Sequence, residues 1–115
     1  MKIEDLAQTI AGQRYNFGCE DDLQIAIASV LSNSSIPFSR EYKLTATDRP
    51  DFLVGKVAIE VKVDGSAVAL TRQVHRYAQS KEVDAVLVVT SRSRHRNIPR
   101  EMNGKPVRVL YLNPL

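Results

Sequence analysis

The sequence has a single cysteine and no tryptophan, and it contains no long apolar run. Cys19 cannot form an internal disulfide, and the lack of a second cysteine excludes a multi-cysteine zinc site. Its surroundings supply no activating partner, so we expect Cys19 to pack at a helix start rather than act as a nucleophile. No apolar stretch approaches the roughly 18 residues of a membrane-spanning helix, and the N-terminus lacks the order of a signal peptide. These absences predict a cytoplasmic protein with no membrane partner.

The length of the chain fits one domain, and the charges are distributed unevenly along it. The 115 residues suffice for one hydrophobic core, and their 43% hydrophobic and 25% charged content is typical of globular proteins. Residues 1–66 carry 7 basic and 10 acidic side chains, whereas residues 67–115 carry 9 basic and 3 acidic ones. An anionic partner contacted by the second half would explain this sorting, and solubility is the alternative.

The central feature is a predicted hairpin between residues 51–54 and 57–63. Gly55-Lys56 suits a two-residue turn with glycine at the position that needs a positive φ. A turn this tight places Asp51 opposite Glu60. Because side chains alternate along a strand, Asp51, Glu60 and Lys62 then share one face, and the apolar residues share the other. A longer turn would shift the register and separate the two acids.

Two acids and a lysine on one face have two interpretations. Directly opposed like charges destabilise a sheet by up to about 1 kcal/mol, so a cation between them would be favourable. Mg²⁺ takes one or two protein carboxylates, with room left for water and phosphate oxygens, and Mn²⁺ could substitute. The alternative is an ordinary solvated strand face, on which charged and apolar residues alternate.

Two helices are predicted before the hairpin. The first covers residues 3–12, and the second covers about 19–31 with an apolar stripe. Glu20 lies near the middle of that stripe. An acid in the first turn favours the helix dipole, and an acid on the inward side also needs a partner such as a metal or a lysine. Both readings of Glu20 stay open from spacing alone.

The remaining pattern alternates strands with one further helix. Residues 38–45 read as a strand, residues 67–80 as a helix, and residues 84–89 as a strand buried on both faces and parallel to its neighbour. In the helix, Gln73 lies beside Tyr77 at the edge of the apolar stripe. Its solvent side carries Arg72 and Arg76, flanked by an exposed histidine.

The C-terminal part begins with a basic segment. Residues 91–100 contain Arg92, Arg94, Arg96 and Arg100, which fit either phosphate contacts or a solvated, mobile loop. No aromatic residue is interleaved, so base stacking is not indicated there. A final strand is predicted at residues 107–112, followed by a short tail, 113–115.

In order, these features resemble the PD-(D/E)xK nuclease superfamily over residues 19–90. Pro50-Asp51, Glu60-Val61-Lys62, the helix acid Glu20, and a Q-x-x-x-Y pattern from Gln73 carry the resemblance. It is nearest to small Holliday-junction resolvases and stand-alone VRR-NUC domains, which are often homodimeric and phage-encoded. The implied fold is α/β: a restriction-endonuclease-like mixed sheet of about five strands flanked by helices, in the order α-α-β-β-β-α-β-β. Residues 1–18 would be a helical extension and residues 91–115 a basic loop and final strand.

The resemblance also implies a chemistry. Asp51, Glu60 and Glu20 would bind Mg²⁺, with Lys62 and Gln73 completing the catalytic set of a DNA endonuclease acting on duplex or branched DNA. The exposed arginines, which are Arg72, Arg76, Arg92, Arg94, Arg96 and Arg100, would contact the DNA. The alternative is a nucleic-acid-binding module that keeps the nuclease fold without cutting.

Overall fold

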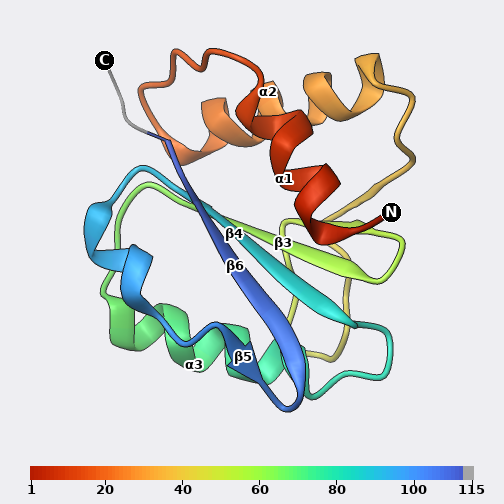
Figure 1. Ribbon diagram of the computed structural model, residues 1–115, viewed down its shortest axis with the longest axis vertical. Coiled ribbons are helices and arrows are strands. Elements are labelled where there is room, and N and C mark those ends of the chain that lie inside the picture. The colour runs from red at the N-terminus through yellow and green to blue at the C-terminus, as the bar shows by residue number, and fades with distance from the viewer. Residues whose placement is uncertain (113–115) are drawn as a thin grey trace.

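The computed structural model describes residues 1–112 as three helices and one mixed sheet (Figure 1). The helices are α1 (Ile3–Ala11), α2 (Glu20–Asn33) and α3 (Ala67–Ala78), and a short 3-10 helix, η1, spans Ser93–Asn97. The strands are β1 (Ser39–Arg40), β2 (Phe52–Val54), β3 (Val57–Lys62), β4 (Ala85–Thr90), β5 (Glu101–Met102) and β6 (Lys105–Tyr111). This is the predicted α/β class and element order, with one strand more than expected.

The six strands form a sheet in the order β1-β2-β3-β4-β6-β5. The three central strands, β3, β4 and β6, run parallel, and the outer pairs are antiparallel. Every residue of β4 is buried, as its unbroken apolar run predicts. None of the helices in residues 1–112 combines the length and apolar character needed to cross a bilayer.

Helices cover both faces of this sheet, so the core has two layers. In Figure 1, α1 and α2 lie on one side of the strands and α3 on the other. The first layer joins the buried residues of α1 and α2 to one face of β2, β3 and β4. The second packs the apolar stripe of α3 on the opposite face. Leu6 and Ile10 of α1 are fully buried in the first layer, so α1, in the predicted N-terminal extension, packs against the sheet core.

Two strand predictions need correction. The strand expected at 38–45 ends at Arg40, because Glu41 has a φ of 47° and its N–H bonds to the Asp51 carbonyl oxygen at 2.9 Å. Residues 41–51 instead form a loop. In the C-terminal part, β5 pairs with β6 through a two-residue turn, in which Asn103 and Gly104 have φ values of 52° and 73°. Asn-Gly is the usual sequence of such a turn, and it marks the strand that periodicity missed.

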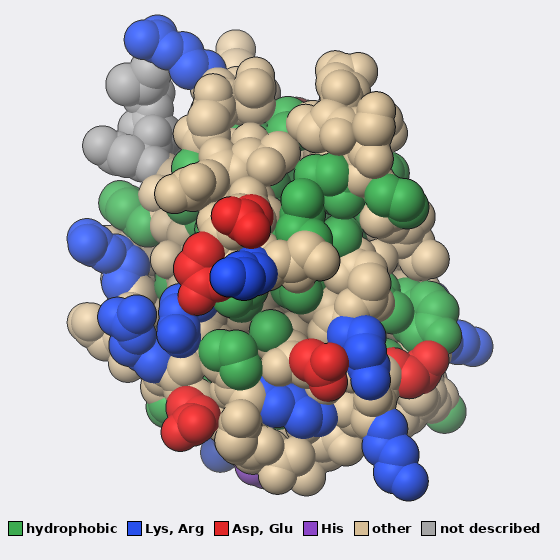
Figure 2. Space-filling model, turned by 45° about the vertical axis from the view of Figure 1, so that its right-hand side comes forward, with side chains coloured by type: hydrophobic (Ala, Val, Ile, Leu, Met, Phe, Trp, Pro, Cys, Tyr) green, Lys and Arg blue, Asp and Glu red, His purple; other side chains and the backbone are tan. Residues whose placement is uncertain are grey.

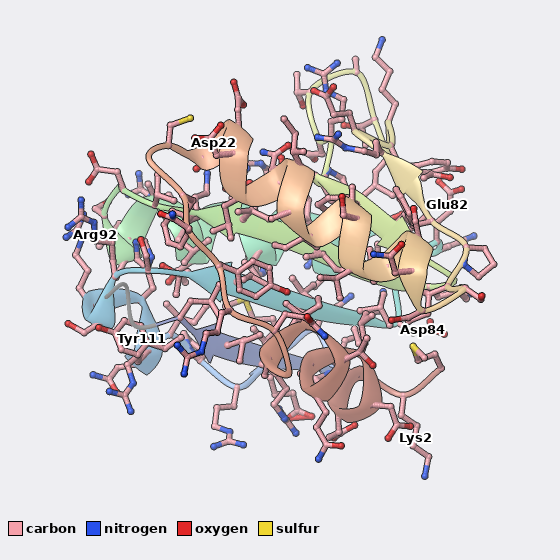
Figure 3. The ribbon with its side chains drawn as sticks, turned by 90° about the horizontal axis from the view of Figure 1, so that it is seen from above. Lys2, Asp22, Glu82, Asp84, Arg92 and Tyr111 are labelled. Carbon is pink, nitrogen blue, oxygen red and sulfur yellow. The ribbon has the colours of Figure 1, made fainter. Side chains whose placement is uncertain are left out.

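The parallel topology brings three loops to one end of the sheet. Figure 3 shows Arg92 and Tyr111 together at one end, and Glu82 and Asp84 at the opposite end. Lys62, Thr90 and Tyr111 end the three parallel strands in register. The first turn of α2, marked by Asp22, also lies toward this end (Figure 3). Charged side chains of separate segments therefore meet there.

Candidate active site

The hairpin register places Asp51 beside β3. Phe52 pairs with Ile59 and Val54 with Val57, as the two-residue turn predicts. Asp51 directly precedes β2, and its Oδ2 accepts a 2.7 Å hydrogen bond from the N–H of Val61. The carboxylate thus extends the β2–β3 pairing by one position, which fixes its orientation. Its other oxygen, Oδ1, receives no hydrogen bond from residues 1–112.

Glu60 lies on the α3 side of β3 and is only 4% exposed. Its Oε1 accepts a 2.8 Å hydrogen bond from the hydroxyl of Tyr77, and its Oε2 lies 3.3 Å from Nζ of Lys62. The Tyr77 hydroxyl in turn accepts a 2.9 Å hydrogen bond from Nε2 of Gln73. Gln73 therefore acts on Glu60 through Tyr77, one step removed from the carboxylate.

The two acids have altered protonation equilibria. Burial, followed by the negative charge of Glu60, raises the pKa of Asp51 from 3.8 to about 7, against the opposing Val61 N–H and Lys62. Burial also raises the pKa of Glu60, while the Tyr77 hydroxyl and Lys62 hold it down. The pKa of Tyr77 is raised by burial and by Glu60, so it stays a hydrogen-bond donor. A half-buried carboxylate whose ionisation is opposed by a buried neighbouring carboxylate forms a site that a cation would stabilise.

Glu20 is the first residue of α2 and is half-buried. Its negative charge contributes to the raised pKa of both Asp51 and Glu60, so it belongs to the same neighbourhood. Within residues 1–112, however, no three histidine, cysteine, aspartate or glutamate side chains are arranged to hold a metal ion. Lys62 contacts Glu60 directly at 3.3 Å, whereas Asp51 is linked to Glu60, Lys62 and Glu20 through the effects of their charges on its pKa.

The donor set fits a hard divalent cation. Asp51 and Glu60 offer carboxylate oxygens, and the site contains no nitrogen or sulfur ligand that would favour a softer metal. The main-chain N–H of Val61 and the hydroxyl of Tyr77 each occupy one carboxylate oxygen and hold the group in place. Hydrogen bonds of this kind keep metal ligands oriented.

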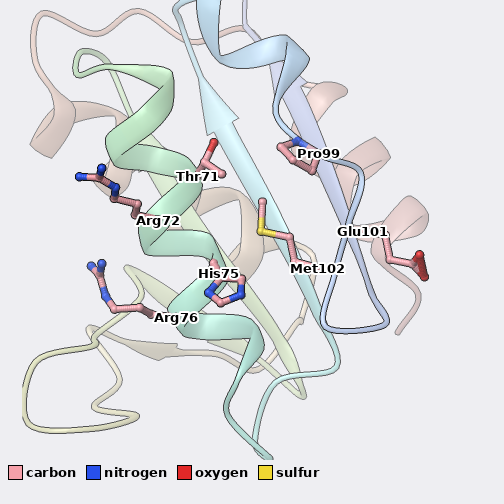
Figure 4. Close-up of a pocket in the computed structure, with 7 residues that line it drawn as sticks. All are labelled: Thr71, Arg72, His75, Arg76, Pro99, Glu101 and Met102. Atoms are coloured by element: carbon pink, nitrogen blue, oxygen red, sulfur yellow. The ribbon is translucent and has the colours of Figure 1, made fainter.

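The arginines of α3 point away from the sheet. Arg72 is exposed, and Nε of Arg76 donates a 2.9 Å hydrogen bond to Oδ1 of Asp48 in the 41–51 loop. The close-up in Figure 4 shows the guanidinium groups of Arg72 and Arg76 on the same side of the helix. The ion pair with Asp48, which sequence reasoning missed, ties the loop before Asp51 to α3.

The basic segment after β4 is anchored to the turn after β3. Nε of Arg92 donates to the Val63 carbonyl oxygen at 2.7 Å. Arg94 donates to the Gly65 carbonyl oxygen at 2.8 Å and to Asp64 at 2.7 Å. Residues 93–97 of this segment thus form a short 3-10 helix, and phosphate contact by its arginines stays a prediction.

The other two arginines of this segment differ in their surroundings. Arg96 lies over the ring of Tyr111, 5.2 Å from its centroid, whereas Arg100 is exposed. Figure 2 shows acidic side chains directly beside basic ones on one face of the molecule, so the positive charge there is partly neutralised. Arg76 and Arg94 pair with Asp48 and Asp64, so the six arginines do not form one uniform basic surface.

His95 is a buried residue that no pattern in the sequence predicts. It is fully buried, with Nε2 2.8 Å from the Gly65 carbonyl oxygen and Nδ1 2.6 Å from Oγ1 of Thr90. Because a carbonyl oxygen can only accept, Nε2 carries the proton. This contact closes η1 onto the turn that follows Lys62. His95 lies between two arginines in the sequence, and no local pattern indicates that its side chain is buried.

Comparison with known proteins gives no relative: no family model, no curated protein and no solved structure matches this chain.

Proposed function

We propose that this protein is a Mg²⁺-dependent nuclease that hydrolyses DNA phosphodiester bonds. The observation that supports it most is the pair of oriented, partly buried carboxylates of Asp51 and Glu60, with Lys62 3.3 Å from Glu60. The same residues carry the resemblance to the PD-(D/E)xK nucleases. Burying two neighbouring carboxylates opposes folding unless a bound ligand compensates for their charge. Such pairs are typical of functional sites.

In this proposal Asp51 and Glu60 hold the cation, and water or main-chain carbonyl oxygens complete its ligands. When bound, Mg²⁺ would polarise the phosphoryl oxygens and lower the pKa of a water molecule. Lys62 would orient the attacking water and offset the charge that develops on the phosphate. Glu20 would add negative charge at the edge of the site and act through water.

Gln73 and Tyr77 position these groups. Tyr77 donates to Glu60, and Gln73 donates to Tyr77, so the relay fixes Oε1 of Glu60 and leaves Oε2 facing Lys62. A carboxylate with one oxygen held by a neutral donor keeps its charge and its direction when Lys62 moves toward substrate.

The proposed DNA contacts and the proposed homodimer follow from the charge distribution and the resemblance. The exposed arginines of α3 and η1 would contact the phosphate backbone, and a homodimer would pair two sites across duplex or branched DNA. Mn²⁺ would substitute for Mg²⁺, and the protein would work inside the cell. A chain of 115 residues presents little surface to DNA, which favours such pairing.

One assay tests the proposal. The purified protein is incubated with plasmid, linear duplex, single-stranded and four-way-junction DNA in Mg²⁺, Mn²⁺ or EDTA. We expect cleavage in both metals, none in EDTA, and none with Asp51→Asn or Lys62→Ala, each shown to be folded by circular dichroism. Asp21→Asn and Lys43→Ala make the same changes at exposed positions and should cut normally. Binding without cleavage in both metals would instead favour a non-catalytic binding module.

A further inference from the structure

Two adjoining cavities run along α3, away from Asp51 and Glu60. One has a volume of about 540 Å³ and the other about 380 Å³. They share Thr71, Arg72 and Pro99 in their walls, so together they form one groove between α3 and residues 94–102. We call it the α3 groove. Its volume lies in the range of sites that bind small ligands or single bases.

The α3 groove is apolar on the inside and cationic along one edge. Figure 4 shows Thr71 and His75 on the side of α3 toward Pro99 and Met102. Val68 in the smaller cavity is 61% exposed, so its apolar side chain is accessible to a ligand. The guanidinium group of Arg72 lies on the outer side of the helix (Figure 4). Apolar walls therefore lie beside a row of arginines, which are Arg72, Arg76 and Arg94.

Arg72 is the free cation of this row. Arg76 pairs with Asp48, and Arg94 pairs with Asp64. Within residues 1–112, no acidic side chain pairs with Arg72, and Glu101 is the one acid among the residues that line the two cavities. An exposed arginine without a carboxylate partner beside an apolar wall can bind an anion at little cost in desolvation.

The α3 groove is linked to the proposed active site by shared elements. Helix α3 begins five residues after Lys62, and its opposite side carries Gln73 and Tyr77. The turn at Asp64 and Gly65, which follows the Lys62 strand, is bonded by Arg94 in the wall of the groove. Arg94 therefore connects the turn after the Lys62 strand to the wall of the groove.

We propose that the α3 groove binds a single-stranded segment of nucleic acid that flanks the bond to be cut. The bases lie against Pro99, Met102 and His75, and the phosphates face Arg72. A single strand offers a flat ring face and an anionic phosphate at every nucleotide, which matches apolar walls beside a cationic edge. The inference rests on the proposed nuclease function, and it makes DNA with a single-stranded tail or flap the preferred substrate.

Binding in EDTA tests the α3 groove without cleavage. Fluorescence anisotropy measures the affinity for a labelled single strand of about ten nucleotides, within the usual range of site sizes. We expect Val68→Asp and Arg72→Glu each to weaken binding by roughly tenfold, as for the loss of a stacked base or a phosphate contact. Arg14→Glu makes the same charge change at an exposed position outside the groove and should alter the affinity by less than about twofold. An equal loss in Arg14→Glu and Arg72→Glu, or no loss in Val68→Asp, overturns the proposal.

Cleavage assays test the groove and the nuclease function separately. In Mg²⁺, the ratio of cleavage of tailed duplex to blunt duplex should exceed one for the wild type and fall toward one in Val68→Asp. If the wild type cuts DNA with no preference for tails, the groove assignment fails and the nuclease stands. If the wild type binds single strands through Val68 and Arg72 but cuts nothing, the nuclease fails and the groove stands. If Val68→Asp instead splits a dimer and leaves single-strand binding intact, the groove is an interface between copies and the proposal fails.

Discussion

The hydroxyl of Tyr77 donates a 2.8 Å hydrogen bond to Oε1 of Glu60, and both side chains are almost completely buried. This contact joins α3 to β3 in the second core layer. It also holds the pKa of Glu60 down against the upward effect of burial. A buried tyrosine hydroxyl needs a hydrogen-bond acceptor, and Glu60 supplies it, so the contact stabilises the core at the proposed active site.

Tyr77→Phe tests this contact with little change in volume. Removing the hydroxyl leaves Glu60 without a neutral donor, so we expect a loss of about 1 kcal/mol in the free energy of unfolding. The pKa of Glu60 should rise further, and Mg²⁺ should bind more weakly at neutral pH. Urea unfolding and calorimetric Mg²⁺ titration measure the two effects. Tyr42→Phe removes a hydroxyl that bonds Glu82 at the surface, and it should change neither; equal effects in both variants would contradict the assignment.

Asp51→Asn should stabilise the metal-free protein while it abolishes cleavage. The folded pKa of Asp51 is about 7 and its ordinary value is 3.8, so between these values the folded protein binds more protons than the unfolded chain. Stability therefore falls as pH rises from about 4 to 7 and levels off above that range. The asparagine keeps the acceptor for Val61 N–H and carries no charge.

The measurement is thermal unfolding in EDTA from pH 4 to 8. The melting temperature of Asp51→Asn should exceed that of the wild type by several degrees at pH 8, for a gain of the order of 1–2 kcal/mol. The difference should vanish near pH 4, where both forms are neutral at this position. A variant that is less stable than the wild type at pH 8 would show that the carboxylate is satisfied without a cation.

The hairpin and the central strand could be predicted because residues close together in the sequence determine both. Gly55 sets the turn, the turn sets the register, and the register brings Asp51 to Glu60. The unbroken apolar run of β4 is compatible only with a strand that is buried on both faces in the middle of the sheet. The acids of the candidate site could thus be paired from spacing alone.

What the sequence did not predict depends on contacts between distant segments. The strand expected at 38–45 ends at Arg40, because the N–H of Glu41 bonds the carbonyl oxygen of Asp51 ten residues later. His95 is buried because Gly65, thirty residues earlier, offers its carbonyl oxygen. No window of sequence contains both partners of such a contact, so periodicity could not show it. The Asn103-Gly104 turn is different, since its signal was local.

His95→Ala should loosen the turn that follows Lys62. The substitution removes the hydrogen bonds to Gly65 and Thr90 and leaves a cavity, so we expect a loss of roughly 2–3 kcal/mol. Hydrogen exchange should increase at residues 63–66 and 91–95. His75→Ala is the matched control, because His75 is exposed on α3 and its removal should cost less than about 0.5 kcal/mol. Equal losses in the two variants would refute the role of His95.

Gly55→Ala tests whether the turn sets the geometry of the site. Gly55 has a φ of 57° with open space around its Cα, so an added methyl group meets no atom but strains the backbone. We expect a loss of about 1 kcal/mol in urea unfolding. Gly12→Ala is the control: Gly12 has a φ of −70°, which alanine adopts without strain, so it should be neutral or slightly stabilising. If Gly55→Ala also weakens Mg²⁺ binding, the turn controls the distance between Asp51 and Glu60; if Gly55→Ala is as stable as the wild type, the two-residue turn does not fix the register.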